Sequence, residues 1–200
     1  MADEGLLYKK MLHTVEEVDA KIDEMAAEII RKYDPHSTLF VGLLNGALPF
    51  QTKLMFAIAR QDPSFHPNAQ FMIVSRYADE RDPGMPSLVA DLPKKYHDLA
   101  DQTVVLIDDL IDEGDTLEFA AEHLLEYGAK EVHSVVLVKK EKDTTADRQT
   151  MYNSITYGFE APDVWLTGMG MDDSRLTRGS GRLGDEGNRW AGWIAEANTR

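Results

Sequence analysis

The sequence contains no cysteine and few basic residues, and both shortages exclude classes of function. Without cysteine there are no disulfides, no thiolate nucleophile and no zinc–thiolate site, so a metal ion must be held by oxygen or imidazole ligands. Lys and Arg number 21 against 35 Asp and Glu, which gives a formal net charge of −14. This charge opposes nonspecific binding to nucleic acid and to anionic membranes. An anionic ligand would need local groups or a metal ion to overcome it.

Long hydrophobic runs are also missing. No apolar stretch approaches the ~18 residues that a membrane span needs, and residues 1–19 lack the basic start and apolar centre of a secretion signal. We therefore expect a cytoplasmic protein with no membrane and no nucleic acid among its partners. No linker rich in Pro, Gly or Ser divides the chain, and 43% hydrophobic residues suffice for one sizeable core. We expect a single domain over residues 1–200.

The spacing of apolar residues predicts alternating strands and helices. Thr14 and Glu17 form a capping box at a helix start, and Gly128 marks a helix end. Helices are predicted at residues 14–33, 48–58 and 116–127, with a short closing helix over 190–197. Strands are predicted at residues 38–44, 70–74, 104–107 and 134–138, with shorter ones at 155–159 and 164–167. Residues 77–86 are predicted to be a mobile loop. The unit from residue 104 to 138 has the length of a βαβ crossover, which predicts a parallel strand pair.

The stretch VVLIDDLIDEGDTL, residues 104–117, crowds acidic residues at the end of a buried strand. Five of the eight residues that follow VVLI are acidic: Asp108, Asp109, Asp112, Glu113 and Asp115. In an open parallel sheet, ligands bind at the carboxyl ends of the strands, and a strand-to-helix turn offers its backbone N–H groups to an anion. The groups expected to hold a monoester phosphate are the amides of Glu113, Gly114, Asp115 and Thr116 and the Thr116 hydroxyl. Asp108 and Asp109 can bind Mg²⁺ or the hydroxyls of a ribose.

The residues of this stretch alone also allow other interpretations. The acids could be solvated charges at a helix N-terminus. A phosphoacceptor receiver domain also ends an apolar strand with an acidic pair, but there the pair follows the first strand, whereas Asp108 follows at least two. The DDxxD string occurs in prenyl-diphosphate enzymes as well, on a helix of an all-helical fold, whereas VVLI favours a strand.

VVLIDDLIDEGDTL resembles the phosphoribosyl pyrophosphate (PRPP) motif of type I phosphoribosyltransferases, and its DEGxTL ending is similar to that of bacterial hypoxanthine-guanine members. Further similar segments are VGLLNGALPF (residues 41–50), SRYADERDPG (75–84), VLVKK (136–140) and GFEAPDVWLTGMGMD (158–172). They resemble the family's first loop, its mobile loop and its purine-binding end. The resemblance covers about residues 13–178 in the family's order. Residues 179–200, with Trp190 and Trp193, form a C-terminal tail without an assignment.

The resemblance implies a role for each matching residue. Asp112 would be the acid/base near N7 of a purine. PRPP or nucleotide would be bound by Leu44, Asn45, Gly46, Asp108, Asp109, Glu113, Gly114, Asp115, Thr116 and Arg178, with a non-proline cis peptide at Leu44-Asn45. The base would be bound by Lys139 or its neighbour Lys140, Trp165, Leu166 and Asp172. The mobile loop would contribute Arg76 and Tyr77, and the metal ligands would be Asp108, Asp109 and Asp172.

The implied fold is α/β, with a central, mostly parallel sheet, helices on both faces and a small hood built from both ends of the chain. The implied activity is Mg²⁺-dependent transfer of ribose 5-phosphate from PRPP to a 6-oxopurine, hypoxanthine or guanine, with release of pyrophosphate, in purine salvage. A homo-oligomer, a dimer or a tetramer, is expected. The alternatives are a non-catalytic regulator that senses PRPP or a nucleotide, and a phosphoribosyltransferase for another base such as xanthine.

Overall fold

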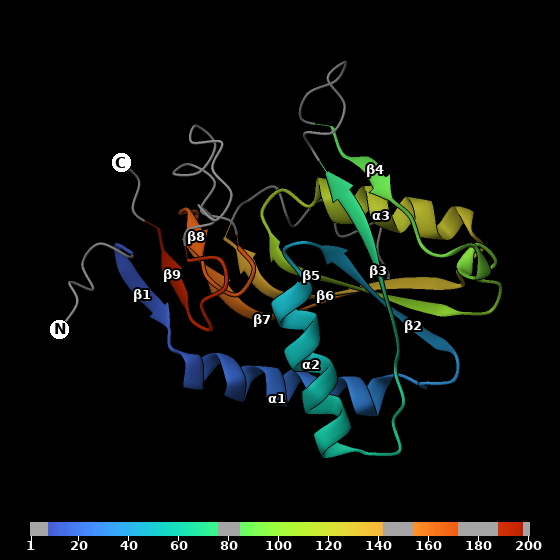
Figure 1. Cartoon of the computed structure of the whole chain (residues 1–200), viewed down its shortest axis with the longest axis horizontal. Helices are drawn as coiled ribbons and strands as arrows, with labels where there is room; N and C mark the ends of the chain where they lie inside the picture. The colour runs from blue at the N-terminus through green and yellow to red at the C-terminus, as the bar shows by residue number, and fades with distance from the viewer. Residues whose placement is uncertain (1–7, 76–84, 142–153, 172–187, 198–200) are drawn as a thin grey trace.

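The protein is built on a six-stranded sheet in the order β4-β3-β2-β5-β6-β7 (Figure 1). The computed structural model describes residues 8–75, 85–141, 154–171 and 188–197. The strands are β2 (Thr38–Leu44), β3 (Asn68–Ser75), β4 (Ser87–Ala90), β5 (Thr103–Ile111), β6 (Glu131–Lys140) and β7 (Ser154–Ala161). All neighbouring strands are parallel except β4, which is antiparallel to β3 at the edge. The predicted α/β fold with a mostly parallel sheet is confirmed.

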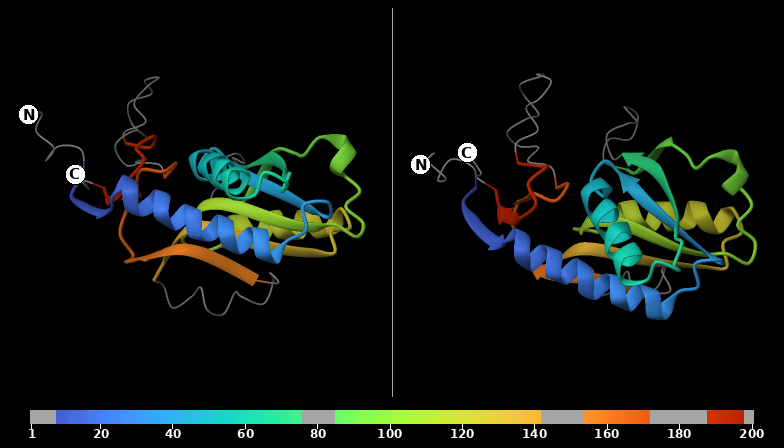
Figure 2. Two further views of the ribbon diagram at one scale, coloured as in Figure 1. Left: turned by 90° about the horizontal axis from the view of Figure 1, so that it is seen from below. Right: turned by 60° about the horizontal axis from the view of Figure 1, so that its bottom comes forward.

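Helices cover both faces of this sheet, as the two views of Figure 2 show. α1 (Val15–Lys32) and α2 (Leu48–Gln61) pack on one face, and α3 (Asp115–Glu126) packs on the other. Alternate strand residues supply the two cores because successive side chains point to opposite faces. In β5, Val105 and Ile107 face α1 and α2, while Val104 and Leu106 face α3. The central strands are therefore apolar on both faces, as the sequence predicted.

Local sequence signals set the helix boundaries. The predicted capping box is present: the Glu17 amide donates to the Thr14 hydroxyl, and the Thr14 amide donates to the Glu17 carboxylate. α3 ends before Gly128, whose φ of 86° lies in the left-handed region that favours glycine. Only three residues separate β5 from α3, so the N-terminus of α3 lies at the carboxyl end of that strand.

A second, three-stranded sheet joins the two ends of the chain in the order β1-β9-β8. Its strands are β1 (Lys10–His13), β8 (Leu166–Thr167) and β9 (Ile194–Glu196). The expected hood from both ends of the chain is thus present (Figure 1). The closing helix predicted over 190–197 is wrong, because β9 pairs with β1 and β8 through backbone hydrogen bonds that no local pattern reveals. The apolar side chains of Ile194 and Ala195 are fully buried in this strand.

The segment after β4 was not predicted to be structured, and it is fixed to α3 by a polar cluster. Asp91 accepts hydrogen bonds from the Tyr127 hydroxyl and, at 3.1 Å, from the His123 imidazole. His97 stacks on the Tyr127 ring at 4.4 Å and follows a short 3-10 turn, η2 (Lys94–Tyr96). This cluster links the edge of the sheet to the C-terminal half of α3. Within the described ranges, no helix is both long and apolar enough to span a membrane.

Candidate active site

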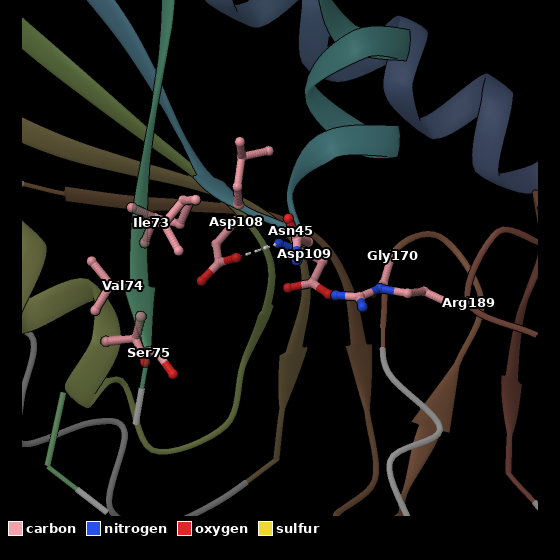
Figure 3. Close-up of a pocket in the computed structure, with 12 residues that line it drawn as sticks. Asn45, Ile73, Val74, Ser75, Asp108, Asp109, Gly170 and Arg189 are labelled. Carbon is pink, nitrogen blue, oxygen red and sulfur yellow. Dashed lines mark hydrogen bonds between the residues drawn. The ribbon is translucent and has the colours of Figure 1, made fainter. Parts of the chain in front are cut away.

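The carboxyl ends of the parallel strands open into a cleft of about 430 Å³. Its walls come from the ends of β2, β3 and β5, from the start of α3 and from the C-terminal segment (Figure 3). The polar and backbone groups that line it belong to Asn45, Gly46, Ser75, Asp108, Asp109, Thr116, Gly170 and Arg189. This is the position at which open α/β sheets bind ligands. The described residues predicted to meet PRPP are therefore brought to one place by the strand order.

Two carboxylates lie side by side at the end of β5. Asp108 is only 8% exposed, and one of its oxygens accepts the Asp109 amide at 3.0 Å. Burial, followed by the negative charge of Asp109, raises the pKa of Asp108 well above its ordinary value. Burial also raises the pKa of Asp109, although a hydrogen bond with Asp108 and the charge of Arg189 act in the opposite direction. The pair favours a cation or a hydroxyl donor, either of which would stabilise its ionised form.

A smaller cavity of about 70 Å³ lies beside this pair, within the turn that leads into α3. It is lined by Asp108, Leu110, Asp112, Glu113, Gly114, Asp115, Thr116 and Leu117. Gly114 precedes the helix with φ of 88°, and the exposed Glu113 sits at the outer side of the turn. This cavity is much smaller than the cleft of about 430 Å³, so it suits a small group. The start of α3 therefore offers amides and a helix dipole to a single phosphate.

The loop after β2 reaches the cleft from the opposite side. The peptide bond between Leu44 and Asn45 is cis, as the resemblance implies. Gly46 lies so near Asp109 that a Cβ at this position would be 2.6 Å from the carboxylate. A Cβ on Gly170 would overlap the carbonyl oxygen of Gly46. Both glycines are required by this close packing of three segments that are distant in sequence.

Arg189 is the site residue that sequence reasoning missed. It lies in the unassigned tail, yet it lines the cleft, and Figure 3 shows its guanidinium extending toward Asp109. Its Nε donates to the Gly170 carbonyl at 2.9 Å, while the Gly170 amide donates to the Arg189 carbonyl at 2.8 Å. Arg189 is therefore joined to Gly170, in the segment predicted to bind the purine, by two hydrogen bonds. No sequence signal identified this arginine, because it follows a segment rich in Gly, Arg and Asp without a recognisable spacing.

The two lysines at the end of β6 lie in different surroundings. Lys140 is buried, and its ammonium donates to Asp112 Oδ2 at 3.1 Å and lies 3.4 Å from Asp163 Oδ1. Lys139, which the resemblance placed at the base, lies over the Tyr157 ring at 5.1 Å. Successive side chains of a strand point to opposite faces, so only one of the two can face Asp112. The structure places Lys140 there, which favours Lys140 over Lys139 as the base contact.

Two further predicted base residues, Trp165 and Leu166, belong to the hood. Leu166 is buried in β8, paired with Glu196, and the Trp165 carbonyl accepts the Ala197 amide at 2.8 Å. Trp165 itself is half-buried. The base-binding segment therefore depends on β9 for its position. Four predicted site residues lie outside the described residues: Arg76, Tyr77, Asp172 and Arg178.

The site suits a magnesium ion that arrives with a phosphorylated substrate. In the part of the chain that the structure describes, no group of three or more His, Asp or Glu side chains could hold a metal ion alone. Mg²⁺ commonly binds through one or two carboxylates while substrate phosphates and waters complete its octahedron. The adjacent carboxylates of Asp108 and Asp109 could supply such ligands, and burial raises the pKa of both groups, so a bound cation would stabilise their ionised forms. The residues present fit the ion expected from the sequence.

Comparison with known proteins agrees with this geometry. Residues 9–174 match the phosphoribosyl transferase domain family, and the chain therefore belongs to that family. Within it, the chain is similar to the hypoxanthine-guanine phosphoribosyltransferase of Bacillus subtilis, with 30% identity over 82% of this chain and 85% of the relative. The enzyme of the same name from Aquifex aeolicus is 31% identical over 82% of this chain and 86% of its own length. A solved hypoxanthine phosphoribosyltransferase from Staphylococcus aureus has the same fold, with a TM-score of 0.73 at 23% identity over 96% of this chain and 92% of that one.

Proposed function

We propose that this protein transfers the 5-phosphoribosyl group of PRPP to a 6-oxopurine, hypoxanthine or guanine, and releases pyrophosphate, in purine salvage. The observation that carries this proposal is the carboxyl end of β5. There the buried Asp108 and the partly buried Asp109 line the larger cleft, and the turn into α3 lines the smaller cavity. The hypoxanthine-guanine phosphoribosyltransferases among the relatives support the choice of substrates.

PRPP would lie across both cavities. The amides from Glu113 to Thr116 and the N-terminus of α3 would bind the 5′-phosphate in the smaller one. Asp108 and Asp109 would accept hydrogen bonds from the ribose hydroxyls. The pyrophosphate would meet the backbone amides of the loop from Leu44 to Gly46, and Arg189 from the opposite wall. Arg178 and Asp172, outside the described residues, remain proposed contacts to the pyrophosphate and to the metal ion and base.

The charges of the site suit the charges of the reaction. As the bond from C1 of the ribose to pyrophosphate breaks and the bond to the purine nitrogen forms, the sugar gains positive charge and the leaving group gains negative charge. The carboxylates of Asp108 and Asp109 lie where they would stabilise the first, and Arg189 where it would stabilise the second. Mg²⁺ held by Asp108 and Asp109, together with Asp172, would neutralise further charge on the departing pyrophosphate.

The purine would lie between the hood and the end of β6. Trp165 would stack on the ring, the Leu166 backbone would hydrogen-bond with its edge, and Lys140, rather than Lys139, would donate to the 6-oxo group. Asp112 accepts a hydrogen bond from Lys140 and lines the smaller cavity, so it would be close to both substrates. It would exchange a proton with N7 of the purine. Arg76 and Tyr77 of the mobile loop would close over the bound substrates and exclude water.

The test is an assay of the purified protein with PRPP, Mg²⁺ and hypoxanthine, guanine or xanthine in turn, with nucleotide and pyrophosphate both measured. We expect turnover with a 6-oxopurine, and we expect Asp112→Asn to lose most of it while it still binds PRPP. Binding of PRPP without turnover of any base would instead indicate a ligand-sensing regulator, and activity with xanthine alone would change the substrate. Full turnover by Asp112→Asn would refute its role in proton transfer. A cytoplasmic location and a dimeric or tetrameric assembly remain predictions.

A further inference from the structure

Three neighbouring strand ends bring two carboxylates to one buried ammonium. The Lys140 side chain is 6% exposed, and its Nζ lies 3.1 Å from Asp112 and 3.4 Å from Asp163. This arrangement follows from the strand order, because β5, β6 and β7 are parallel neighbours and Asp112 comes directly after β5. Lys140 pairs with Ala161 of β7, so Asp163 comes two residues beyond the same level. Asp163 therefore links the end of β6 to the chain that leads into Trp165.

The geometry limits the direction in which Lys140 can donate. An ammonium group carries three N–H donors; that of Lys140 donates one to Asp112 and lies at ion-pair distance from Asp163, which a second can approach. One donor is left for a further acceptor, such as the oxo group of a purine. A lysine side chain has a flexible four-carbon stem, so a single carboxylate would not fix the direction of its ammonium group. Two carboxylates that follow the ends of different strands fix the position of the ammonium group.

We infer that Asp163 is a positioning residue for the base: it holds the Lys140 ammonium between two strand ends, so that one N–H is directed at the 6-oxo group. This inference rests on the proposed function and deepens it. Without Asp163, the ammonium would turn entirely toward Asp112, and its remaining donors would no longer be aimed at the base. Asp163 itself does not need to touch the substrate. Its side chain is 54% exposed, so its replacement leaves no unpaired buried charge of its own.

The expected effect is selective for the base. Asp163→Asn should raise the KM for hypoxanthine or guanine by about tenfold, because a hydrogen bond from a charged donor is lost or misdirected. The KM for PRPP should change less than twofold, since the phosphate cavity and Arg189 do not involve Asp163. Asp163→Glu keeps the carboxylate and should restore most of the affinity for the base. The matched control is Glu160→Gln on β7, which removes an exposed charge that pairs with Tyr157 instead of Lys140.

A double-mutant cycle separates positioning from a general structural role. In a Lys140→Met background, Asp163→Asn should have no further effect on the affinity for the product nucleotide, measured by calorimetry with inosine or guanosine 5′-monophosphate. Additive effects in this cycle would overturn the inference. The inference would also be overturned if Asp163→Asn and Glu160→Gln had the same KM for the base. A third contrary result would be that Asp163→Asn loses affinity for the base and for PRPP equally and has a lower Tm. If Asp163→Asn does not fold, Asp163→Glu decides: a tenfold higher base KM in that variant also overturns it.

Failure of the proposed function would look different. A wild-type protein that turns over no base would refute the transferase proposal, whatever the variants do. A wild-type protein that is active, with Asp163→Asn indistinguishable from it, would refute only the role of Asp163. The wild-type protein therefore tests the proposed function, and the comparison of Asp163→Asn with wild type tests the role of Asp163.

Discussion

Gly46→Ala should damage catalysis while leaving the fold intact. The added Cβ would be 2.6 Å from Asp109 Oδ2 and 2.7 Å from its Cγ, whereas Cβ atoms keep at least 3.0 Å from such neighbours. The carboxylate must therefore move by at least about 0.4 Å, and by nearly twice that distance to reach ordinary van der Waals contact. It can do so without disturbing the core, because Asp109 faces the open cleft.

A shift of this size in a substrate-holding group is costly for catalysis. Misplacement by 1 Å can reduce a rate by about 10²-fold, so we expect kcat/KM for PRPP to fall by about 10- to 100-fold. The KM for the base should change little, because Trp165 and Lys140 belong to other segments. The free energy of unfolding should change by less than about 1 kcal/mol, since only one side chain is displaced toward solvent. Steady-state pyrophosphate release and urea denaturation measure these quantities.

Gly158→Ala is the matched control, with a similar clash in the core. Its Cβ would be 2.9 Å from the Leu137 carbonyl and 3.0 Å from Met25 Sδ, between β7 and α1. Overpacking of this kind should cost about 1–3 kcal/mol of stability and leave kcat/KM nearly unchanged below the Tm. The reasoning is refuted if Gly46→Ala loses stability as Gly158→Ala does, or if it binds and turns over PRPP like the wild type.

Two further predictions concern buried or bound carboxylates. Burial and the charge of Asp109 raise the pKa of Asp108, so stability falls as the pH rises from the unfolded-state pKa of about 3.9, and the loss is complete above the raised value. Asp108→Asn should therefore raise the Tm of the ligand-free protein at pH 7 and abolish turnover. A lower Tm would contradict this. Burial raises the pKa of Asp91, but hydrogen bonds from Tyr127, His123 and the Leu92 amide outweigh it and lower the pKa below its ordinary value. Asp91 thus stabilises the fold above the unfolded-state pKa of about 3.9, and this contribution disappears as the pH falls through the lowered value. Asp91→Asn should cost about 2 kcal/mol at pH 7, measured by urea denaturation, and the difference from wild type should shrink toward pH 3. A difference independent of pH would count against the ion pairing.

The central sheet could be predicted from sequence because its signals are local. β2 matches the predicted residues 38–44 at both ends, since a run of apolar residues is bounded there by Ser37 and by the Asn45-Gly46 turn. β5 is longer than its apolar part, because pairing with β6 continues through Asp108 to Ile111. Hydrophobicity thus located the strand, whereas pairing determined its length. The acidic cluster after this strand indicated a ligand site for a physical reason. Negative charges so close together repel one another unless a cation or hydrogen-bond donors stabilise them.

The parts that could not be predicted depend on long-range pairing. β1 is only four residues long, and it is held by β9 from the other end of the chain. The position of Arg189 in the cleft also depends on a long-range contact, because its backbone carbonyl and its side-chain Nε both form hydrogen bonds with Gly170. Lys139 and Lys140 are the same residue type in adjacent positions, so the sequence does not distinguish them. Only the orientation of β6 decides that Lys140 contacts Asp112. Arg76, Tyr77, Asp172 and Arg178 keep the roles that the resemblance implies as predictions.

The central position of β9 in the hood has a consequence for how the protein is made. The turn proposed to bind phosphate is one continuous segment that joins β5 to α3, so all of its residues are synthesised together. β8, which carries the base-binding backbone, finds its neighbour only in residues 194–196. The segment proposed to bind phosphate is therefore synthesised long before the strand that positions the segment proposed to bind the purine.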